Sequence, residues 1–307
     1  MSTRTALPNL RLGTAPDSWG VWFPDDPKQV PWRQFLDEAA EAGYTAVELG
    51  PFGYLPTDPE QLRDELGRRG LTLTGATAGT ALHRGGDSLG AALAECRPVA
   101  GLLAAMEAPF LVTLPVMYTD LYTGELLEPL ELTAEQWKTL GEGHSELGRV
   151  ILEEFGVAQM FHPHADAHVD TQERIERFLE VTDPTTVSLC LDTGHVAYAG
   201  GDNQAIVAAH PDRIGYVHLK SIDPVVLERV RAEGMSFAQA VQAGAMVEPA
   251  AGEPEMPPLL AQLNALDVPL TAIVEHDLYP AASGVPLPIA VRNQRYYRGC
   301  GLRTTDV

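Results

Sequence analysis

Short apolar runs rich in β-branched residues recur along the chain and alternate with segments of helical periodicity. A continuous apolar run of this length is typical of a strand that is buried on both faces of a parallel sheet. Eight strands are predicted in this way, at residues 10–16, 45–50, 71–76, 110–115, 156–161, 187–192, 214–220 and 270–275.

Between these runs, apolar residues return at helical spacing. In 32–42, Phe35, Leu36 and Ala39 share one face, and Gly43 ends the helix. Thr133 begins a capping-box sequence for a helix that runs to about residue 154. Other helices are predicted near 59–69, 89–106, from 171 onward, and at 203–209, 257–266 and 289–297, with two short helical patterns inside a long excursion at 221–256.

Eight strands, each followed by a helix, with no break in composition between the two halves, predict a (β/α)8 TIM barrel. We expect one domain spanning residues 1–307. The main alternative, a doubly wound open sheet, normally carries a glycine-rich phosphate loop after its first strand, and Gly13-Thr14-Ala15-Pro16 is not such a loop.

Charge and cysteine content narrow the class of partner. The net charge of −21 argues against nucleic acid and anionic membrane surfaces. Three well-separated cysteines, Cys96, Cys190 and Cys300, suggest reduced thiols. The first ten residues lack the apolar core of a signal peptide, and no apolar run is long enough to span a bilayer. We therefore expect a cytoplasmic protein that acts on a small molecule.

Polar residues gather where the predicted strands end, which is where a TIM barrel builds its active site. They are Glu48, His162, His164, Asp192, His195, His218, Lys220, Glu275, His276 and Asp277. A charge at the tip of an apolar strand is costly unless it is paired or bound to a metal. Taken alone, Asp192 is equally well explained as the N-cap of a following helix, with His195 on a loop.

Carboxylate and imidazole ligands together suit Mn²⁺, Co²⁺ or Zn²⁺. As a set, His162, Asp192, His218 and Glu275 predict a metal site, although a structural role is more frequent for any single histidine. His162 and His164 are two residues apart, so both can face the barrel mouth. Glu48 could instead anchor a loop or a histidine, and Lys220 could orient substrate, act as an electrophile or form a salt bridge.

Three loop features have alternative interpretations. Trp19, Trp22 and Phe23 in the first loop form either an aromatic wall for the C–H face of a sugar or ordinary loop packing. The loop at 118–122 is a candidate lid on the basis of loop length alone. Asp166 and His168 are interpreted as surface residues.

Several of these segments carry a family resemblance. Leu191–His195, Val217–Lys220 and Val274–Glu275 resemble the signature of the xylose-isomerase-like sugar isomerase and epimerase barrels. Within that superfamily the chain is most similar to the inosose dehydratase (2-keto-myo-inositol dehydratase) branch. The segments that carry the second similarity are 15–21, 48–56, 162–164, 194–202 and 234–244.

The resemblance implies a divalent ion, Mn²⁺ or Co²⁺ before Zn²⁺ or Mg²⁺, on His162, Asp192, His218 and Glu275. It implies that His164 is an acid/base group or a second ligand, and the roles of His162 and His164 could be exchanged. The chain departs from the family pattern at Ser221, at Asp166-Ala167-His168 and at His276. These departures leave the substrate open.

The resemblance also implies chemistry on a keto-polyol. An ion that acts as a Lewis acid stabilises the enediolate formed when an α-proton leaves. His164 or His195 fits the base by residue type, while Glu48 or Lys220 could polarise or hold hydroxyls. Loss of a β-hydroxyl gives dehydration, which the branch favours. Reprotonation gives isomerisation or epimerisation, and loss of a larger β-group gives an enzyme that acts on 3-keto-glycosides.

Two alternatives come from other functional classes. A metal-free carbohydrate-binding barrel would have little reason to keep Asp192, His218 and Glu275 together. A zinc nuclease of the endonuclease IV type needs more ligands and a basic surface, which the net charge of −21 disfavours. We expect a small neutral polyol or keto-sugar as substrate, and a homo-oligomeric assembly.

Overall fold

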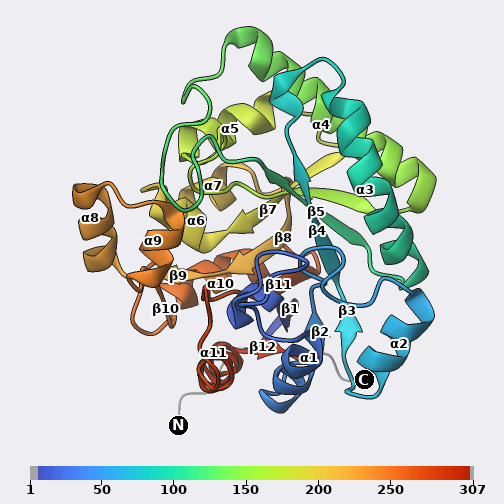
Figure 1. Cartoon of the computed structure of the whole chain (residues 1–307), viewed down its shortest axis with the longest axis vertical. Helices are drawn as coiled ribbons and strands as arrows, with labels where there is room; N and C mark the ends of the chain where they lie inside the picture. The colour runs from blue at the N-terminus through green and yellow to red at the C-terminus, as the bar shows by residue number, and fades with distance from the viewer. Residues whose placement is uncertain (1–5, 305–307) are drawn as a thin grey trace.

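In the computed structural model, which describes residues 6–304, helices surround a ring of parallel strands (Figure 1). The strands of the ring are β1 (Leu7–Thr14), β2 (Ala46–Val47), β3 (Thr72–Leu73), β4 (Gly75–Thr80), β5 (Phe110–Pro115), β6 (Ala158–Phe161), β7 (Val187–Asp192), β8 (Ile214–Leu219) and β11 (Leu270–Val274). A short final strand, β12 (Leu302–Arg303), pairs with β1.

The two ends of the sheet, β3 and β4, are consecutive in the chain, and this completes the ring. The strand order is β3-β2-β1-β11-β8-β7-β6-β5-β4, and only Thr74 separates β3 from β4 along the chain. The backbone N–H of Thr74 donates to the carbonyl of Val47, 3.0 Å away. The predicted single α/β domain with a TIM-barrel-like parallel sheet is therefore confirmed. Residues 1–5 and 305–307 of the predicted 1–307 domain, including part of the N-terminal stretch considered above, lie outside the described residues.

The helices of the barrel pack their apolar faces on the sheet. They are α1 (Trp32–Glu41), α2 (Pro59–Gly67), α3 (Ser88–Ala105), α4 (Ala134–Phe155), α5 (Gln172–Val181), α7 (Asn203–Ala209), α10 (Met256–Asn264) and α11 (Pro286–Cys300). The predicted face of α1 is confirmed, since Phe35, Leu36 and Ala39 are buried. The predicted capping box at Thr133 is also present.

The main differences from the predicted elements concern two strands and one helix. The third predicted strand is divided into β3 and β4 and extends to Thr80. The second predicted strand is regular only over Ala46–Val47, because Gly50 adopts a positive φ of 67° and turns the chain. A short helix that the periodicity did not predict, α6 (Thr193–Tyr198), follows β7 directly.

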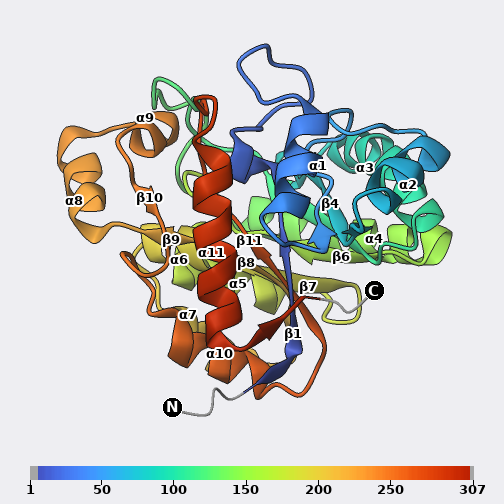
Figure 2. The same cartoon turned by 90° about the horizontal axis from the view of Figure 1, so that it is seen from below.

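The long excursion forms a small unit beside the barrel, seen at the left of Figure 1 and again in Figure 2. It contains β9 (Ser221–Ile222), α8 (Pro224–Glu233), α9 (Phe237–Gln242) and β10 (Met246–Val247). Ser236 Oγ donates to the carbonyl of Tyr122 at 2.8 Å, and the Ala238 N–H donates to the carbonyl of Leu121 at 3.1 Å. The excursion and the loop after β5 thus hold each other in place.

Inside the barrel, an apolar layer lies below a polar layer. The apolar layer consists of Ala15, Val112, Met160, Cys190, Tyr216 and Ile273. Side chains two residues apart on a strand face the same side. The residues two positions further along β6, β7, β8 and β11 are therefore expected to face the same interior, and they are His162, Asp192, His218 and Glu275. Among residues 6–304, no helix is long and apolar enough to cross a membrane.

Candidate metal centre

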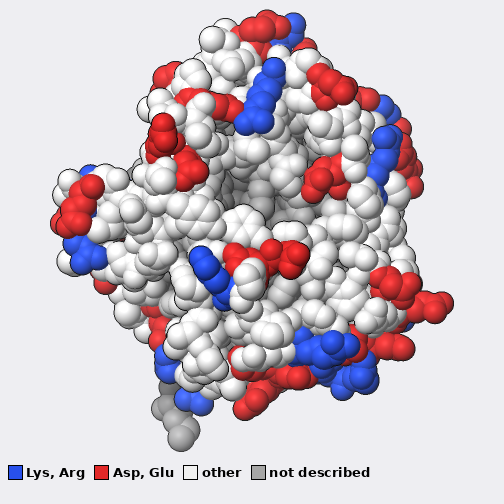
Figure 3. Space-filling view, viewed as in Figure 1, with Lys and Arg blue, Asp and Glu red and all other residues white. Residues whose placement is uncertain are grey.

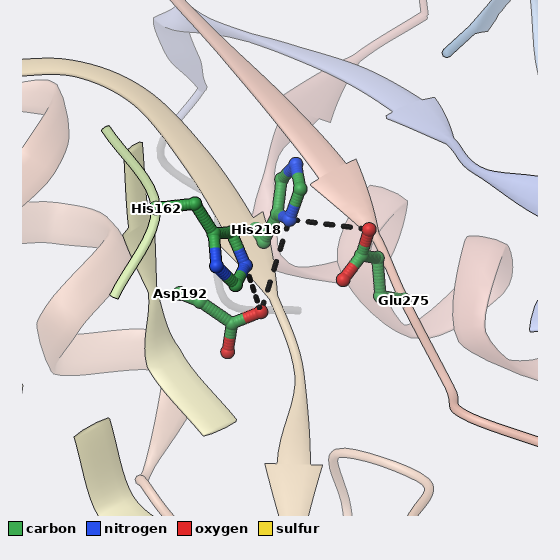
Figure 4. Close-up of side chains that lie close together, drawn as sticks. All are labelled: His162, Asp192, His218 and Glu275. Carbon is green, nitrogen blue, oxygen red and sulfur yellow. Dashed lines mark hydrogen bonds and ion pairs between the residues drawn. The ribbon is translucent and has the colours of Figure 1, made fainter. Parts of the chain in front are cut away.

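Four side chains from four adjacent strands converge at the carboxyl end of the barrel (Figure 4). His162 Nε2 lies 3.2 Å from Asp192 Oδ2, and His218 Nδ1 lies 3.1 Å from Glu275 Oε1 and 3.8 Å from Asp192 Oδ2. One ligand atom from each of His162, Asp192, His218 and Glu275 lies within 4.8 Å of the other three. All four residues are buried, and the group is consistent with a divalent metal site.

Asp192 combines the two roles that the sequence left as alternatives. Its Oδ1 accepts the backbone N–H groups of Gly194 and His195, each at 2.8 Å, and so caps the N-terminus of α6. Its Oδ2 faces the cluster. Gly194 is required at this turn, since a Cβ atom there would lie 2.5 Å from the Lys220 side chain. The turn brings both Asp192 and His195 to the site.

The histidines of the cluster have unused ring nitrogens. Nδ1 of His162 has no hydrogen-bond partner. The ring nitrogens of His218 lie close to carboxylate oxygens of Glu275 and Glu48, but without the geometry of a hydrogen bond. Glu48 Oε2 lies 3.3 Å from His218 Nε2, so Glu48 contacts a histidine of the cluster rather than anchoring a loop. Buried polar atoms without partners are costly. A cation held among these groups would relieve that cost, so the donor set fits a metal ion.

Electrostatics at the site are dominated by carboxylates. Burial tends to lower the pKa of His218, but Cys190, Glu275 and Glu48 outweigh it and raise that pKa well above the usual value. Burial tends to raise the pKa of Glu275, yet His218 and Lys220 hold it well below its usual value. Two carboxylates, those of Glu48 and Glu275, thus lie against the ring of His218.

Lys220 is surrounded by three acids. Its Nζ lies 3.0 Å from Glu275 Oε2, 3.0 Å from Asp277 Oδ2 and 3.4 Å from Asp192 Oδ2. Burial tends to lower the pKa of Lys220, but Asp192, Asp277 and Glu275 raise it well above its usual value. Lys220 is therefore a buried ammonium group at neutral pH.

His164 and His195 form a separate pair beside the cluster, with ring centroids 4.0 Å apart. Burial, followed by the charge of His162, lowers the pKa of His164 to about 4. Burial likewise lowers the pKa of His195 well below its usual value. Both imidazoles are therefore neutral near pH 7.

Backbone groups fix the tautomers of this pair. The carbonyl of Ala165 lies 2.7 Å from His164 Nδ1, so Nδ1 of His164 carries the proton and Nε2 keeps a lone pair. The N–H of Ala165 donates to Nδ1 of His195 at 3.1 Å, which leaves the ring proton of His195 on Nε2. Nε2 of His164 is therefore a hydrogen-bond acceptor, and Nε2 of His195 is a hydrogen-bond donor.

A cavity of about 370 Å³ opens above these groups. His162, His164, His195, Lys220 and Glu275 all line it. Trp22 and Phe23 line it too, as the aromatic-wall interpretation expected. Trp19 does not: it is fully buried in the core, where its Nε1 donates to Glu38 Oε2 at 2.7 Å and its ring packs on Phe35.

His168 corrects the interpretation of 166–168 as surface residues. It is only 3% exposed, and its Nε2 lies 2.9 Å from the carbonyl of Pro129. Glu128 lies beside it and contacts His83 Nε2 at 2.6 Å and Arg84 Nε at 2.7 Å. The loop after β5 therefore covers His168. Asp166 is partly buried.

Among the cavity residues that the sequence did not single out, Asp17 and Phe237 lie nearest the chemistry described above. Asp17 lies in the loop after β1, and burial together with Glu275 and Asp277 raises its pKa well above the usual value. Phe237 of α9 packs over both His195 and His164, with ring centroids 5.4 and 5.1 Å apart. Asp17 follows a predicted strand and could have been found from that position, whereas nothing in the sequence indicates that the excursion folds back over the mouth.

Comparison with known proteins points to one family. Residues 36–290 match the family described as xylose isomerase-like TIM barrel. The inosose dehydratase of Geobacillus thermodenitrificans (strain NG80-2) is 31% identical over 301 residues, which cover 95% of this chain and 98% of that protein. The inosose dehydratase of Geobacillus kaustophilus (strain HTA426) is 33% identical over 279 residues, covering 89% of each chain.

Solved structures share the fold at lower identity. A crystal structure of the IOLI protein with a zinc atom matches with a TM-score of 0.71 and 14% identity, covering 97% of this chain and 100% of that chain. The 3-keto-D-glucoside 4-epimerase YcjR from E. coli matches with a TM-score of 0.68 and 15% identity, covering 95% and 100%. These likenesses concern the fold alone.

Proposed function

The chain belongs to the xylose isomerase-like TIM barrel family, and we propose that it is a metal-dependent lyase that removes water from a keto-polyol or keto-sugar. Two relatives that are 31% and 33% identical over most of their length are inosose dehydratases. The observation that carries the proposal is the pairing of a neutral base, His164, with a buried ammonium group, Lys220, beside a buried cluster of metal-ligand type.

We assign the ligand set to His162, Asp192, His218 and Glu275, with His162 rather than His164 as the ligand from β6. His162 Nε2 contacts Asp192 within the cluster, whereas the His164 ring lies against His195. When bound, a divalent ion such as Mn²⁺ or Co²⁺ would act as a Lewis acid that polarises the substrate carbonyl. Glu48 is then a positioning residue that holds His218.

His164 is the base in this proposal. Its Nε2 keeps a lone pair because Nδ1 donates to the carbonyl of Ala165. His195 has the opposite tautomer and is a hydrogen-bond donor at Nε2. An α-proton of the substrate passes to His164 Nε2, and the electrons of the C–H bond move toward the carbonyl.

Lys220 and His195 hold the leaving hydroxyl. Lys220 Nζ lies 3.3 Å from His195 Nε2, and both atoms carry protons, so an oxygen placed beside them accepts from two donors. When the β C–O bond breaks, its electron pair leaves with the oxygen, and a proton from Lys220 completes a water molecule. Lys220 is the acid because it becomes a neutral amine, whereas neutral His195 would become an anion.

The test is the incubation of Mn²⁺-loaded protein with 2-keto-myo-inositol in D₂O, followed by enedione absorbance and deuterium incorporation. We expect enedione formation in the unsubstituted protein. In His164→Asn, whose amide can still donate to the Ala165 carbonyl, we expect a rate about 10²–10⁴ times lower. Deuterated or epimerised substrate without enedione would reassign the enzyme to isomerisation or epimerisation.

A further inference from the structure

The lining of the cavity differs between its two sides. The charged and imidazole groups come from the β6, β7, β8, β11 and β1 side of the barrel, and include His164, His195, Lys220 and Asp277. The opposite side, formed after β2 and on β4 and β5, presents Pro51, Phe52, Gly79 and Leu114, together with the backbone of Ala78, whose side chain packs in the outer core. The polar side chains there are Thr77 and, exposed at the outer edge, Glu95.

Aromatic side chains line other parts of the same cavity. Trp22, Phe23 and Phe237 line the cavity together with Leu121. Trp22 stacks on Tyr279, with ring centroids 4.4 Å apart. The face in Figure 3 is hollowed near its centre, and uncharged residues make up much of the surrounding surface.

A polyol ring carries hydroxyls around its whole edge, and buried hydroxyls need hydrogen-bond partners. The charged side supplies such partners in Lys220, His195 and Asp277. The apolar side supplies few, so burying hydroxyls there would be unfavourable, whereas burying an aromatic ring there is favourable. The two sides therefore fit a molecule with a polar part and an apolar part.

Gly79 leaves room for that apolar part. A Cβ atom built at Gly79 meets no other atom within 4 Å, although the residue lies on β4 and lines the cavity. The cavity of about 370 Å³ falls in the range of about 300–1,000 Å³ that is typical of drug-sized ligands. Space and apolar lining thus coincide on the side of the barrel away from the cluster.

We propose that the substrate is a keto-sugar or keto-polyol that carries an aromatic substituent, with the polyol on the β6–β11 side and the aromatic group against Phe52, Gly79 and Leu114. This inference rests on the proposed function only for the identity of the polar part. It assigns the β2, β4 and β5 side of the mouth as the determinant of specificity.

The test compares binding of two ligands to the Mn²⁺-loaded protein by calorimetry. The probes are the methyl and the phenyl β-D-glucoside oxidised to the 3-ketone, which differ in the apolar group alone. We expect the phenyl compound to bind at least about tenfold more tightly. Equal dissociation constants, or binding of neither compound, would overturn the inference.

A space-filling variant locates the aromatic group. In Gly79→Leu, we expect the ratio of the two dissociation constants to fall toward one, because the new side chain fills the open space. Gly67→Leu adds the same side chain in open space outside the cavity, at the end of α2, and should keep the ratio. A ratio that stays unchanged in Gly79→Leu would overturn the inference. Enedione formation from 2-keto-myo-inositol is scored separately, so failure of the lyase proposal gives a different result.

Discussion

Lys220 Nζ lies 3.3 Å from Nε2 of His195, deep in a pocket where both groups are buried. The positive charge of Lys220 contributes to lowering the pKa of His195, after burial and the charge of His164. It also contributes to lowering the pKa of His164, after burial and the charge of His162. One ammonium group therefore helps to keep two imidazoles neutral.

Replacing Lys220 by Met should raise the pKa of both histidines. The acid limb of the residual kcat/KM profile is then expected to move to higher pH, because the base becomes protonated sooner as the pH falls. Histidine titration followed by NMR provides the same comparison without turnover. An acid limb and titration curves that coincide with those of the unsubstituted protein would refute the electrostatic role of Lys220.

Two substitutions of Asp192 should separate its role as the cap of α6 from its role in the cluster. In Asp192→Asn, the side-chain oxygen still accepts the N–H groups of α6, so the fold is kept while activity falls by about 100-fold or more. Asp192→Ala also loses the cap, which costs roughly a further 1 kcal/mol of stability. Urea unfolding and metal content measured on both variants check this, and equal unfolding free energies would argue against the cap.

Chelation should destabilise the protein as well as inactivate it. Asp192 and Glu275 place two buried carboxylates in a group whose ligand atoms lie within 4.8 Å of one another, and a divalent ion would offset their mutual repulsion. A ligand at 100 times its dissociation constant adds about 2.7 kcal/mol to the free energy of unfolding. Thermal unfolding with and without chelator measures the difference. An unchanged midpoint, together with full activity and no metal by elemental analysis, would remove the metal from the mechanism.

His144 predicts a pH dependence of stability away from the site. Its ring is fully buried between Phe161 and Phe178 and accepts a hydrogen bond from Gln159. Burial lowers its pKa from 6.5 to about 3. Between pH 3 and pH 6.5, His144 is therefore protonated in the unfolded chain but neutral in the folded chain. The associated stability is complete above pH 6.5 and is lost at roughly 1.4 kcal/mol per pH unit as the pH falls toward 3.

The check is urea unfolding between pH 4 and 8 for the unsubstituted protein and His144→Gln. The variant is less stable at pH 7 but should lose stability less steeply on acidification, because its amide does not titrate. Parallel curves for the two proteins would show that His144 is not the titrating group.

Glu128 should control the order of the loop after β5. Glu128→Gln weakens the contacts to His83 and Arg84, and we expect a loss of about 1–3 kcal/mol of stability with faster hydrogen exchange in residues 118–130. Glu125→Gln makes the same change at an exposed position of the same loop and serves as the control. Equal exchange rates in the two variants would mean that Glu128 does not hold the loop.

The ligand-type cluster could be predicted from sequence because parallel strands deliver their carboxyl ends to one place. Each of the four residues stands at the end of an apolar run: His162, Asp192, His218 and Glu275. The barrel places the strands that carry them side by side. The burial of His168 could not be predicted in this way. It depends on Glu128 and Pro129, about forty positions earlier in the chain, and no local pattern encodes that contact.

The tautomers of His164 and His195 could not be predicted from the sequence either. Both are set by the backbone of Ala165, whose N–H and carbonyl point at different rings. Phe237 illustrates the same limit at a larger scale, since its excursion packs on the loop after β5 through Ser236 and Tyr122. Sequence periodicity describes elements, whereas these contacts depend on how elements far apart in the chain meet.

The divided carboxylate of Asp192 has an evolutionary consequence. One oxygen serves the fold by capping α6, and the other faces the cluster. Selection for foldability alone would retain an acid or amide here even in a lineage that had abandoned catalysis. An aspartate at this position in a distant homologue is therefore poor grounds for inferring activity, and Glu275, which has no capping duty in this structure, is the more informative residue to compare.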